Sequence, residues 1–518
     1  MFNSLSKKTY FEYSLFLLPV GLLFGEVPTS ISEFIIAGTF LLQDNIAEKF
    51  KRLYHSKFFW ICISVYLLHL FGLTYTSDFI YAFHDLNIKV PLLLFPILLF
   101  AADMMSNKVL FHLLNFFIFV VFINLSFLCL NYFIHYEQIN EIRDASIFIS
   151  HIRLGLISAL GLLYVVFLPI ILKPKNYFLY IIAFILIFTE MLYLGLVSGL
   201  VAFFTVLIFS SIVFLIQNRL YKKLLIFFCF IGLILLTIGY YVYHIKQFYL
   251  PNKINNYSLL STTSNHNLYT NDTTYQYQEN GNLVFINICN KELSKEWNKR
   301  STIQFDSLDK KGNQIKYTLY RYLSSKGIAK DSIGIAHLNQ QDIANIEKGY
   351  PNYYYATTNA LEKKTYELLM ERNYYKGNRD ASGKTLTLRE VYWQNAWYIW
   401  KQYFLFGVGT GDVQQAYKDF YTNHTTNLNK KFQLRAHNQF LTIGLTFGII
   451  GLLIFLFFLI YLLIKTQHSS LFILYFTFWC IMFLSFFIDD TLETQAGATF
   501  VAFFNTLLIK FISSEREK

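Results

Sequence analysis

The chain has 518 residues, of which 54% are hydrophobic, 19% aromatic and only 15% charged. A soluble globular protein carries about 25% charged residues, so this chain has too few charges to cover a water-facing surface of its size. The composition excludes a disordered chain, a collagen, a coiled coil and a soluble nucleic-acid binder, and it indicates a polytopic membrane protein. The net charge of +11 is therefore interpreted against a membrane first.

Apolar runs long enough to cross a bilayer recur along the chain, and we predict an all-α membrane protein with about twelve transmembrane helices. The small-residue cleavage site of a signal peptide does not follow the first run, so this run is expected to stay as the first span. The expected spans are roughly 10–25, 29–43, 58–76, 90–105, 109–133, 153–172, 177–195, 197–217, 223–244, 437–464, 469–488 and 494–512.

The distribution of Lys and Arg predicts the orientation of these spans. With a cytoplasmic N-terminus, the cytoplasmic segments hold 16 Lys and Arg and the short external loops hold 3. We therefore expect both termini in the cytoplasm. The expected domains are an N-terminal membrane domain over 1–244 with about nine spans, an extracytoplasmic loop domain over 245–436, and a C-terminal membrane domain over 437–518 with about three spans.

The loop domain 245–436 carries 25 Lys and Arg against 16 Asp and Glu, a net charge of +9. It is either simply solvated or in contact with something anionic. Its pattern predicts mixed structure, with a strand and a short helix within 282–304 and helices over 315–325, 340–349 and 359–375.

The segment 385–406 is rich in aromatic residues. Trp393, Trp397 and Trp400 recur with helical spacing, and Arg389 lies one turn before Trp393. This stripe indicates either an amphipathic helix at the membrane interface, where Trp and Tyr prefer to sit, or a platform that faces a sugar or an isoprenoid. Both interpretations hold together if an active site lies at the interface, and Trp393 and Trp397 are then expected to contact substrate.

A glycine-rich turn follows at residues 407–412, with the sequence GVGTGD. The backbone N–H groups of such a turn can cradle a phosphate. The turn is neither a nucleotide-binding P-loop nor a dinucleotide fingerprint, because no Gly-Lys-Ser/Thr follows it and no strand precedes it. The alternative is a tight connection between two interfacial helices.

The loop ends in Arg435, Ala436, His437 and Asn438, at the mouth of the tenth expected span. Ionisable side chains at this depth are costly unless they are solvated or used. Imidazole is an acid or a base near neutral pH, and guanidinium binds phosphate with two hydrogen bonds. The cluster therefore predicts a functional site, with a merely interfacial histidine as the alternative.

Metal ligation is not expected from the sequence. The loop has no Asp-x-Asp motif, and the five cysteines have no zinc spacing. The adjacent carboxylates Asp489 and Asp490 lie at the end of a span, where such pairs are usually solvated.

His437 and Asn438, then nine residues, Gly448, two residues and Gly451, together resemble the motif of the O-antigen ligase superfamily. The single large external loop before this motif is similar to that family as well. The residues that precede the motif, which are Arg389, Trp393 and the glycine turn at 407–411, also occur in an order similar to that of the family.

The resemblance implies a GT-C-like fold and the transfer of a glycan from an undecaprenyl-diphosphate carrier to an acceptor hydroxyl, which is lipid A-core for a ligase. The reaction takes place on the periplasmic face of the bacterial inner membrane and needs no ATP or other cofactor. The resemblance implies that Arg389 and Arg435 bind the diphosphate, that His437 deprotonates the acceptor and that Asn438 orients it. The expected partners are the glycan donor, lipid A-core or another hydroxyl acceptor, and membrane lipids, and nucleic acid is excluded by location.

The chain departs from the family at one position. Family members often carry Ser-Arg near the start of the span after the seventh, where the Arg binds the lipid pyrophosphate, whereas here Ser198 is followed by Gly199. Arg153, expected on the same external side, is the substitute we predict. His151 beside it is either a satisfied interfacial histidine or a second site residue.

Three other functions stay open at this stage. An O-antigen polymerase uses the same donor and extends the glycan, and a protein O-oligosaccharyltransferase transfers it to Ser or Thr. A lipid or glycan transporter belongs to another class and is marked by ionisable residues within spans and by inverted repeats. The expected spans hold very few such residues, with Glu33 and Glu190 as the exceptions, so an enzyme is favoured.

Overall fold

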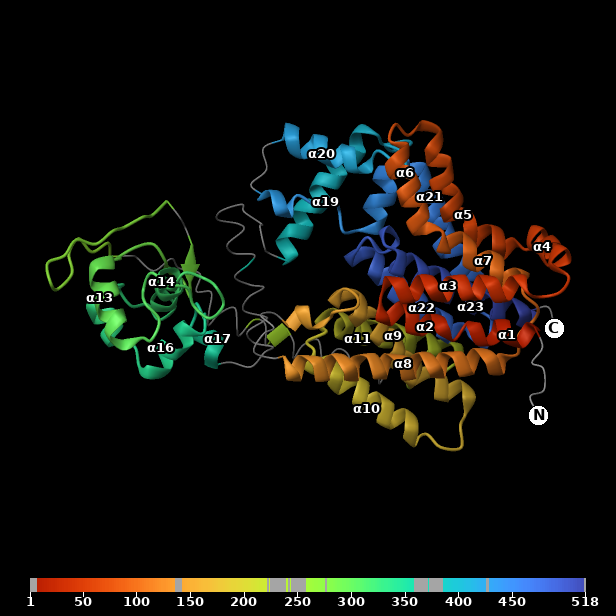
Figure 1. Cartoon of the computed structure of the whole chain (residues 1–518), viewed down its shortest axis with the longest axis horizontal. Helices are drawn as coiled ribbons and strands as arrows, with labels where there is room; N and C mark the ends of the chain where they lie inside the picture. The colour runs from red at the N-terminus through yellow and green to blue at the C-terminus, as the bar shows by residue number, and fades with distance from the viewer. Residues whose placement is uncertain are drawn as a thin grey trace. The chain divides into compact units, whose positions relative to one another are not determined.

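The computed structural model describes residues 7–135, 142–220, 223, 239–240, 243, 258–274, 277–357, 371, 385–424 and 428–516, and these are mostly helical (Figure 1). They form two compact units. The first comprises Met1–Leu224, Tyr392–Thr425 and Leu434–Lys518, and the second comprises Leu225–Val391 and Thr426–Gln433. The domain boundaries expected at 244 and 437 stay a prediction.

The first unit is built from apolar helices joined by short turns. Its α-helices are α1 Lys7–Ser14, α2 Leu17–Phe24, α3 Glu26–Leu41, α4 Ile46–His55, α5 Lys57–Phe71, α6 Phe79–Lys89, α7 Pro91–Ala101, α8 Asn107–Ile134, α9 His151–Leu172, α10 Phe178–Tyr193, α11 Val197–Gln217, α20 Val413–Asn423, α21 Gln439–Thr466, α22 Phe472–Ile488 and α23 Gln495–Arg516. Short 3-10 turns are η1 Gly72–Tyr75, η2 Ile142–Ala145 and η4 Thr491–Glu493. Helix α19, Thr385–Gln402, begins in the second unit and continues into the first.

Several of these helices are suited to a bilayer, so the protein is a polytopic membrane protein. Among the described residues, seven helical stretches are long and apolar enough to cross a membrane: Lys57–Tyr75, Phe79–Ala101, Asn107–Ile134, His151–Leu172, Val197–Gln217, Gln439–Thr466 and Gln495–Glu515. Helices α10 and α22 are apolar but shorter.

Five of the roughly twelve expected spans are not among these seven. Two of them, 177–195 and 469–488, correspond to the shorter helices α10 and α22. The first two expected spans, 10–25 and 29–43, correspond to the three short helices α1, α2 and α3. Gly25 separates α2 from α3 with a φ of 118°, a conformation that glycine adopts without steric cost. The ninth expected span, 223–244, lies almost wholly outside the described residues.

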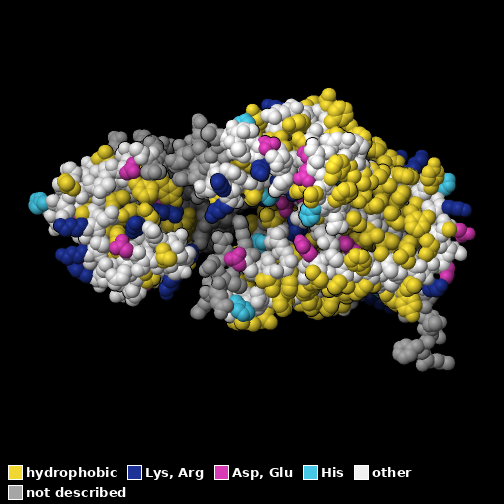
Figure 2. Space-filling view, turned by 45° about the horizontal axis from the view of Figure 1, so that its top comes forward, with side chains coloured by type: hydrophobic (Ala, Val, Ile, Leu, Met, Phe, Trp, Pro, Cys, Tyr) yellow, Lys and Arg dark blue, Asp and Glu magenta, His cyan; other side chains and the backbone are white. Residues whose placement is uncertain are grey.

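Apolar side chains cover much of the outside of the first unit. Figure 2 shows them as a broad hydrophobic surface on the face it displays. Large exposed apolar side chains lie on several of the long helices, among them Phe119 and Phe127 on α8, Ile185 on α10 and Phe457 on α21. A water-soluble monomer rarely exposes apolar surface on this scale, whereas lipid chains cover it at no cost.

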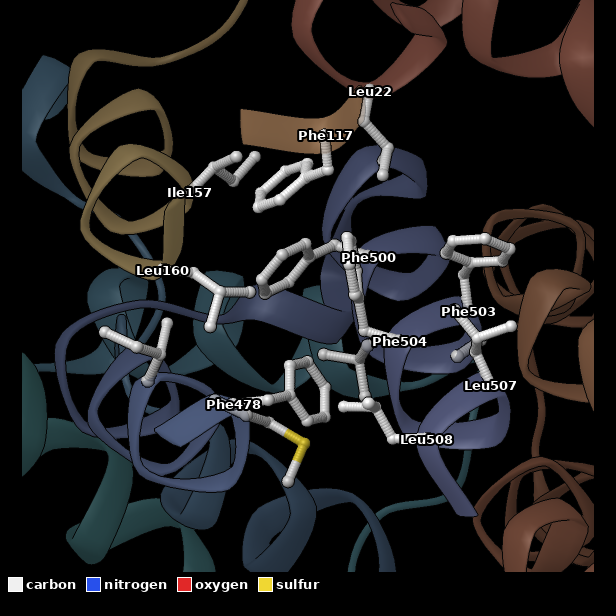
Figure 3. Close-up of a cluster of buried hydrophobic side chains, with 14 of the residues drawn as sticks. Leu22, Phe117, Ile157, Leu160, Phe478, Phe500, Phe503, Phe504, Leu507 and Leu508 are labelled. Carbon is white, nitrogen blue, oxygen red and sulfur yellow. The ribbon is translucent and has the colours of Figure 1, made fainter. Parts of the chain in front are cut away.

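Helix α23 lies at the centre of the unit, because 89% of its apolar stretch is buried. Aromatic rings from three helices meet around it (Figure 3). The ring centroids of Phe504 and Phe117 on α8 lie 5.0 Å apart, and those of Phe478 on α22 and Phe500 lie 5.7 Å apart. These ring contacts pack α8 and α22 against α23.

The start of α1 and the end of α23 lie at the same end of the first unit (Figure 1). The ammonium group of Lys8 donates to the carbonyl of Met104 at 2.6 Å, and that of Lys510 donates to the carbonyl of Ala102 at 3.2 Å. Cations gathered at one end are what the distribution of Lys and Arg predicts for a cytoplasmic side. Which end faces the cytoplasm stays a prediction.

The second unit has a small core of its own around Trp297, which is fully buried. Its helices are α13 Asn290–Arg300, α14 Ile315–Ser325, α15 Ser332–Ala336, α16 Gln340–Glu347 and α17 Tyr354–Thr357, with a 3-10 turn η3 at Lys430–Phe432 (Figure 1). An antiparallel hairpin pairs β1 Gln278–Glu279 with β2 Asn282–Leu283, and Gln278 faces Leu283.

Helices expected over 315–325 and 340–349 are confirmed as α14 and α16. Helix α16 begins with a capping box between Asn339 and Asp342, and Gly349 follows its end with a φ of 77°. Of the helix expected over 359–375, all but residue 371 lies outside the described residues.

Candidate functional site

His437 lies in the first unit, directly before α21, and its backbone is unusual. Its φ of 46° places it in the left-handed region, which a residue with a Cβ atom rarely adopts. The carboxylate of Asp490 accepts hydrogen bonds from the backbone N–H groups of His437 at 3.1 Å and Asn438 at 2.9 Å. It also accepts one from the hydroxyl of Thr442 at 2.6 Å. Asp490 therefore stabilises the turn that presents His437.

Asn438 caps the helix that follows. Its side-chain oxygen accepts a hydrogen bond from the N–H of Leu441 at 3.1 Å, and its amide donates to the carbonyl of Phe487 at 3.4 Å. A cap of this kind stabilises a helix by roughly 1 kcal/mol. The side chain that the resemblance assigns to acceptor orientation thus also has a structural role.

The imidazole of His437 lies close to residues from two other segments, the end of α22 and helix α19. Its Nδ1 lies 3.3 Å from Oδ1 of Asp489, which follows α22, and its ring centroid lies 5.7 Å from that of Tyr392 on α19. The other oxygen of Asp489, Oδ2, lies 3.7 Å from Nη2 of Arg153 on α9. Asp489 therefore brings Arg153 and His437, which the sequence places far apart, into one cluster.

The guanidinium of Arg153 is only partly satisfied. The side chain is 17% exposed, and its contact with Asp489 is its one ion pair among the described residues. The Nε atom is buried and has no hydrogen-bond partner in the described structure. A buried N–H without a partner costs about 1–3 kcal/mol, and an anion that binds here would remove that cost.

The two neighbouring aspartates differ in their electrostatics. Burial raises the pKa of Asp489, but the hydrogen bond with His437 and the charge of Arg153 outweigh it and leave the pKa below its ordinary value. For Asp490 burial dominates, and its pKa is raised even though Arg435 and Thr442 oppose the shift. Asp489 is therefore the carboxylate that carries a negative charge beside His437.

Arg435 belongs to a second charged cluster in the same unit. Its Nη1 lies 3.3 Å from Oε2 of Glu493 and donates to the hydroxyl oxygen of Tyr81 at 3.3 Å. Glu493 also pairs at 3.0 Å with Lys89, which is fully buried and pairs with Asp85 at 2.5 Å. Glu493 thus holds one end of Arg435, and a role of Arg435 toward the diphosphate stays a prediction.

The expectation that Asp489 and Asp490 are solvated is wrong. Asp490 is 5% exposed and Asp489 is mostly buried, and both contact the His437 turn. From the sequence, these two residues are considered as metal ligands and not as partners of His437. Two consecutive acids next to the apolar helix that pairs with α21 were the signal for a partner of His437.

His151 starts α9 and is hydrogen-bonded within the fold. Its Nδ1 lies 2.9 Å from the hydroxyl oxygen of Ser146, and its Nε2 lies 3.3 Å from the carbonyl oxygen of Gly195. These contacts favour the interpretation as a satisfied interfacial histidine. A role in substrate binding stays a prediction.

The three tryptophans on α19 differ in their burial. Trp400 is buried and stacks on Phe404, and its ring lies so close to Gly444 of α21 that a Cβ there would come within 2.8 Å of it. Trp393 and Trp397 are exposed. Trp400 therefore docks α19 on α21 and leaves the other two indoles on the surface.

Arg389 lies on α19 in the stretch that belongs to the second unit. Its side chain is half-buried. A role of Arg389 in binding the diphosphate stays a prediction.

Close helix packing explains why no Arg follows Ser198. Helices α9 and α11 cross at Gly155 and Gly199, where a Cβ on Gly199 would lie 2.6 Å from Cα of Gly155. No side chain larger than hydrogen fits there. Arg153 lies on α9, two residues before Gly155, so a cation is present near this crossing on α9 and not on α11.

The glycine turn is a tight connection. Val408 and Gly409 donate their N–H groups to the carbonyls of Leu445 at 3.0 Å and Thr446 at 2.9 Å. The N–H of Gly411 donates to the hydroxyl of Thr76 at 2.8 Å. These N–H groups are used inside the fold, so the turn does not form a phosphate cradle with them.

No group of three or more His, Cys, Asp or Glu side chains in the described part of the chain is placed to hold a metal ion. Independence of metal stays a prediction.

In this polytopic membrane protein, a histidine, a carboxylate and a partly unpaired arginine thus lie together at one site. The family comparison is more specific. Residues 349–456 match the family model described as O-Antigen ligase. They carry an O-antigen ligase domain, which indicates a membrane glycosyltransferase that acts on lipid-linked glycans. No curated protein matches the chain.

Proposed function

We propose that the protein is an O-antigen ligase-like glycosyltransferase. It moves a glycan from an undecaprenyl-diphosphate carrier to an acceptor hydroxyl, that of lipid A-core, on the periplasmic face of the inner membrane, with both termini in the cytoplasm. The observation that carries this proposal is the cluster of Arg153, Asp489 and His437. The family match over residues 349–456 supports it.

Arg153 supplies the charge for the leaving group. Negative charge develops on the diphosphate as it leaves, and a pre-placed cation stabilises that charge. The buried Nε of Arg153 has no hydrogen-bond partner in the described structure and its ion pair with Asp489 is long, at 3.7 Å. A phosphate oxygen would complete its hydrogen bonding. Arg389 and Arg435 are further candidates for the same diphosphate, with Trp393, Trp397 and His151 as candidates along the glycan.

His437 is the general base in this proposal. A sugar hydroxyl is a poor nucleophile, and its attack is helped by proton transfer to a nearby base. Asp489 lies beside Nδ1 at 3.3 Å and sets the orientation of the ring, so Nε2 takes the proton. The acceptor oxygen forms a bond to the anomeric carbon, the bond from that carbon to the diphosphate oxygen breaks, and the diphosphate leaves with the electron pair.

The first test removes the proposed base and the proposed cation. His437→Ala and Arg153→Ala are each expected to lower glycan transfer by about a hundredfold or more. The measurement is transfer from purified lipid-linked glycan to lipid A-core, resolved on gels, at equal amounts of membrane-inserted protein. His135→Ala, at an exposed position after α8, is the matched control and is expected to retain activity. Full activity of both site variants contradicts the proposal.

The products of the same assay separate the related activities. Transfer to lipid A-core identifies a ligase. Elongation of the lipid-linked glycan identifies a polymerase, and glycan on protein Ser or Thr identifies a protein O-oligosaccharyltransferase.

The second test concerns Asp489. Asp489→Asn keeps the size of the side chain but loses its charge, so it no longer stabilises a protonated His437. We expect transfer to fall roughly tenfold to hundredfold at equal amounts of membrane-inserted protein. Asp144→Asn, at an exposed position in η2, is the control. Transfer rates equal to those of the wild type in Asp489→Asn would remove Asp489 from the mechanism.

A further inference from the structure

The second unit contains a cavity that the proposed transfer chemistry does not use. Its volume is about 450 Å³, which lies within the range of roughly 300–1,000 Å³ that is typical of small-molecule sites. The walls include the ring of Tyr269, the carboxylate of Asp331 and the imidazole of His337. Gly327, which has no side chain, and the small residue Ala329 also line the cavity.

One buried carboxylate fixes two walls of this cavity in place. Glu292 on α13 accepts hydrogen bonds from Thr263 at 2.5 Å and Asn267 at 2.8 Å, both in the loop that forms one wall. It also accepts hydrogen bonds from the N–H of Ser332 at 3.1 Å and its hydroxyl at 2.6 Å, at the start of α15 in the other wall. Burial raises the pKa of Glu292, but these hydrogen bonds outweigh it and lower the pKa to about 2. The cavity is therefore formed before any ligand binds.

Hydrogen bonds also fix the positions of Asp331 and Tyr269 in the lining of the cavity. Asp331 is 4% exposed, and its carboxylate accepts hydrogen bonds from the hydroxyl of Tyr269 and from the N–H of Gly334 at 2.7 Å. The hydrogen bond to Asp331 holds the Tyr269 ring against the cavity. A rigid aromatic ring beside a fixed carboxylate offers one apolar face and one set of hydrogen-bond acceptors.

The lining indicates which ligands fit. It contains no Lys or Arg, although Lys and Arg are numerous in this loop, so an anionic group would meet the carboxylate of Asp331 without the charge of a Lys or Arg to offset it. Ser264 and His337 line the cavity and are both exposed, so the hydroxyl and the imidazole are accessible to a ligand. An uncharged ligand rich in hydroxyl groups pairs with these groups and lays its C–H face on Tyr269.

We propose that this cavity binds a neutral saccharide unit of the glycan that the enzyme handles. The proposal rests on the proposed function, because glycan transfer supplies the reason for a saccharide site on the loop domain. It assigns the loop domain a role in holding glycan, separate from the residues that carry out transfer.

The experiment measures saccharide binding by the full chain in lipid nanodiscs, by titration calorimetry. The probe is the neutral oligosaccharide fraction that mild acid releases from the host's surface glycan, and maltohexaose is the unrelated control. Ser264→Trp fills the cavity from an exposed position, and Tyr269→Ala removes the ring. We expect each variant to weaken binding roughly tenfold, as the loss of a stacked aromatic contact predicts.

Two further variants keep the test specific. Tyr317→Ala removes an exposed tyrosine of α14 outside the cavity and is expected to bind like the wild type. His437→Ala is expected to bind the oligosaccharide normally although it does not transfer glycan. Absence of saturable binding to the wild type, or wild-type binding by both cavity variants, overturns the saccharide site. Binding that depends on the cavity, in a protein whose His437→Ala variant still transfers glycan, supports the site and contradicts the proposed base.

Discussion

Asp489 and Asp490 are neighbours in the chain with opposite roles. Asp490 accepts backbone N–H groups of the His437 turn, and burial raises its pKa. Asp489 faces the imidazole, and the hydrogen bond to His437 and the charge of Arg153 overcome burial and lower its pKa. The carboxylate of Asp490 therefore stabilises a strained backbone conformation, and the carboxylate of Asp489 supplies negative charge to the site.

A single buried lysine in the second unit gives a pH-dependent stability. Lys330 is 3% exposed, and its ammonium donates to the carbonyls of Leu283 at 3.3 Å and Ile286 at 3.0 Å. Burial lowers its pKa to about 7, against about 10.4 for an unfolded chain. Between these values the unfolded state binds more protons than the folded state, so stability rises with pH by up to about 1.4 kcal/mol per pH unit.

We therefore expect the second unit to gain stability between pH 7 and pH 9. The measurement is hydrogen exchange of peptides from residues 277–357 in the full chain, corrected for the intrinsic exchange rate. Lys330→Met is expected to abolish the dependence, whereas Lys291→Met, at an exposed position on α13, is expected to keep it. A flat profile in the wild type would show that Lys330 stays charged in the folded state.

At the scale of elements, α21 depends on a break in its helical geometry. Gly448 has φ 67° and ψ −167° inside the helix. Residues in and just before the glycine turn satisfy the backbone groups that this break leaves unpaired. The N–H of Ile449 donates to the carbonyl of Phe404 at 2.8 Å, and the N–H of Val408 donates to the carbonyl of Leu445 at 3.0 Å. Irregular backbone at membrane depth is tolerated where protein satisfies it in this way.

Gly448→Ala is expected to destabilise the protein by about 1–3 kcal/mol. A Cβ at this position would meet the carbonyl of Leu405 and the nitrogen of Phe406, and the positive φ is unfavourable for alanine. The measurement is the melting temperature in detergent, together with glycan transfer. Gly38→Ala is the matched control, because a Cβ on Gly38 within α3 meets nothing within 4 Å. A melting temperature for Gly448→Ala at or above that of Gly38→Ala would contradict this account of the break.

At the scale of the whole chain, a buried cluster of charged side chains joins α6 to the turn that precedes α23. Lys89 and Glu493 are 404 residues apart and lie 3.0 Å from each other, with Asp85 and Arg435 completing the cluster. Burial raises the pKa of Glu493, but the charges of Lys89 and Arg435 outweigh it and lower the pKa well below its ordinary value. Two cations and two carboxylates balance one another in this cluster.

Removal of either partner leaves the other charge buried. Lys89→Met and Glu493→Gln are each expected to destabilise the protein by about 3–5 kcal/mol, and the double variant by less than their sum. The measurement is a double-mutant cycle on denaturant unfolding in detergent. Lys299→Met breaks an exposed pair with Glu296 and is expected to change stability by no more than about 1 kcal/mol. Additive losses in the cycle would contradict direct coupling between Lys89 and Glu493.

Composition and local pattern by themselves determined the class of the protein, the apolar segments, helices such as 315–325 and the motif that begins at His437. These features depend on residues near one another in the chain. Only the tertiary structure decided that Asp489 faces His437, that Trp400 is buried while Trp397 is exposed, and that Gly199 leaves no room for a side chain. Each of these depends on contacts between distant segments and on the loss of water that follows, and neither is encoded in the local pattern of residues.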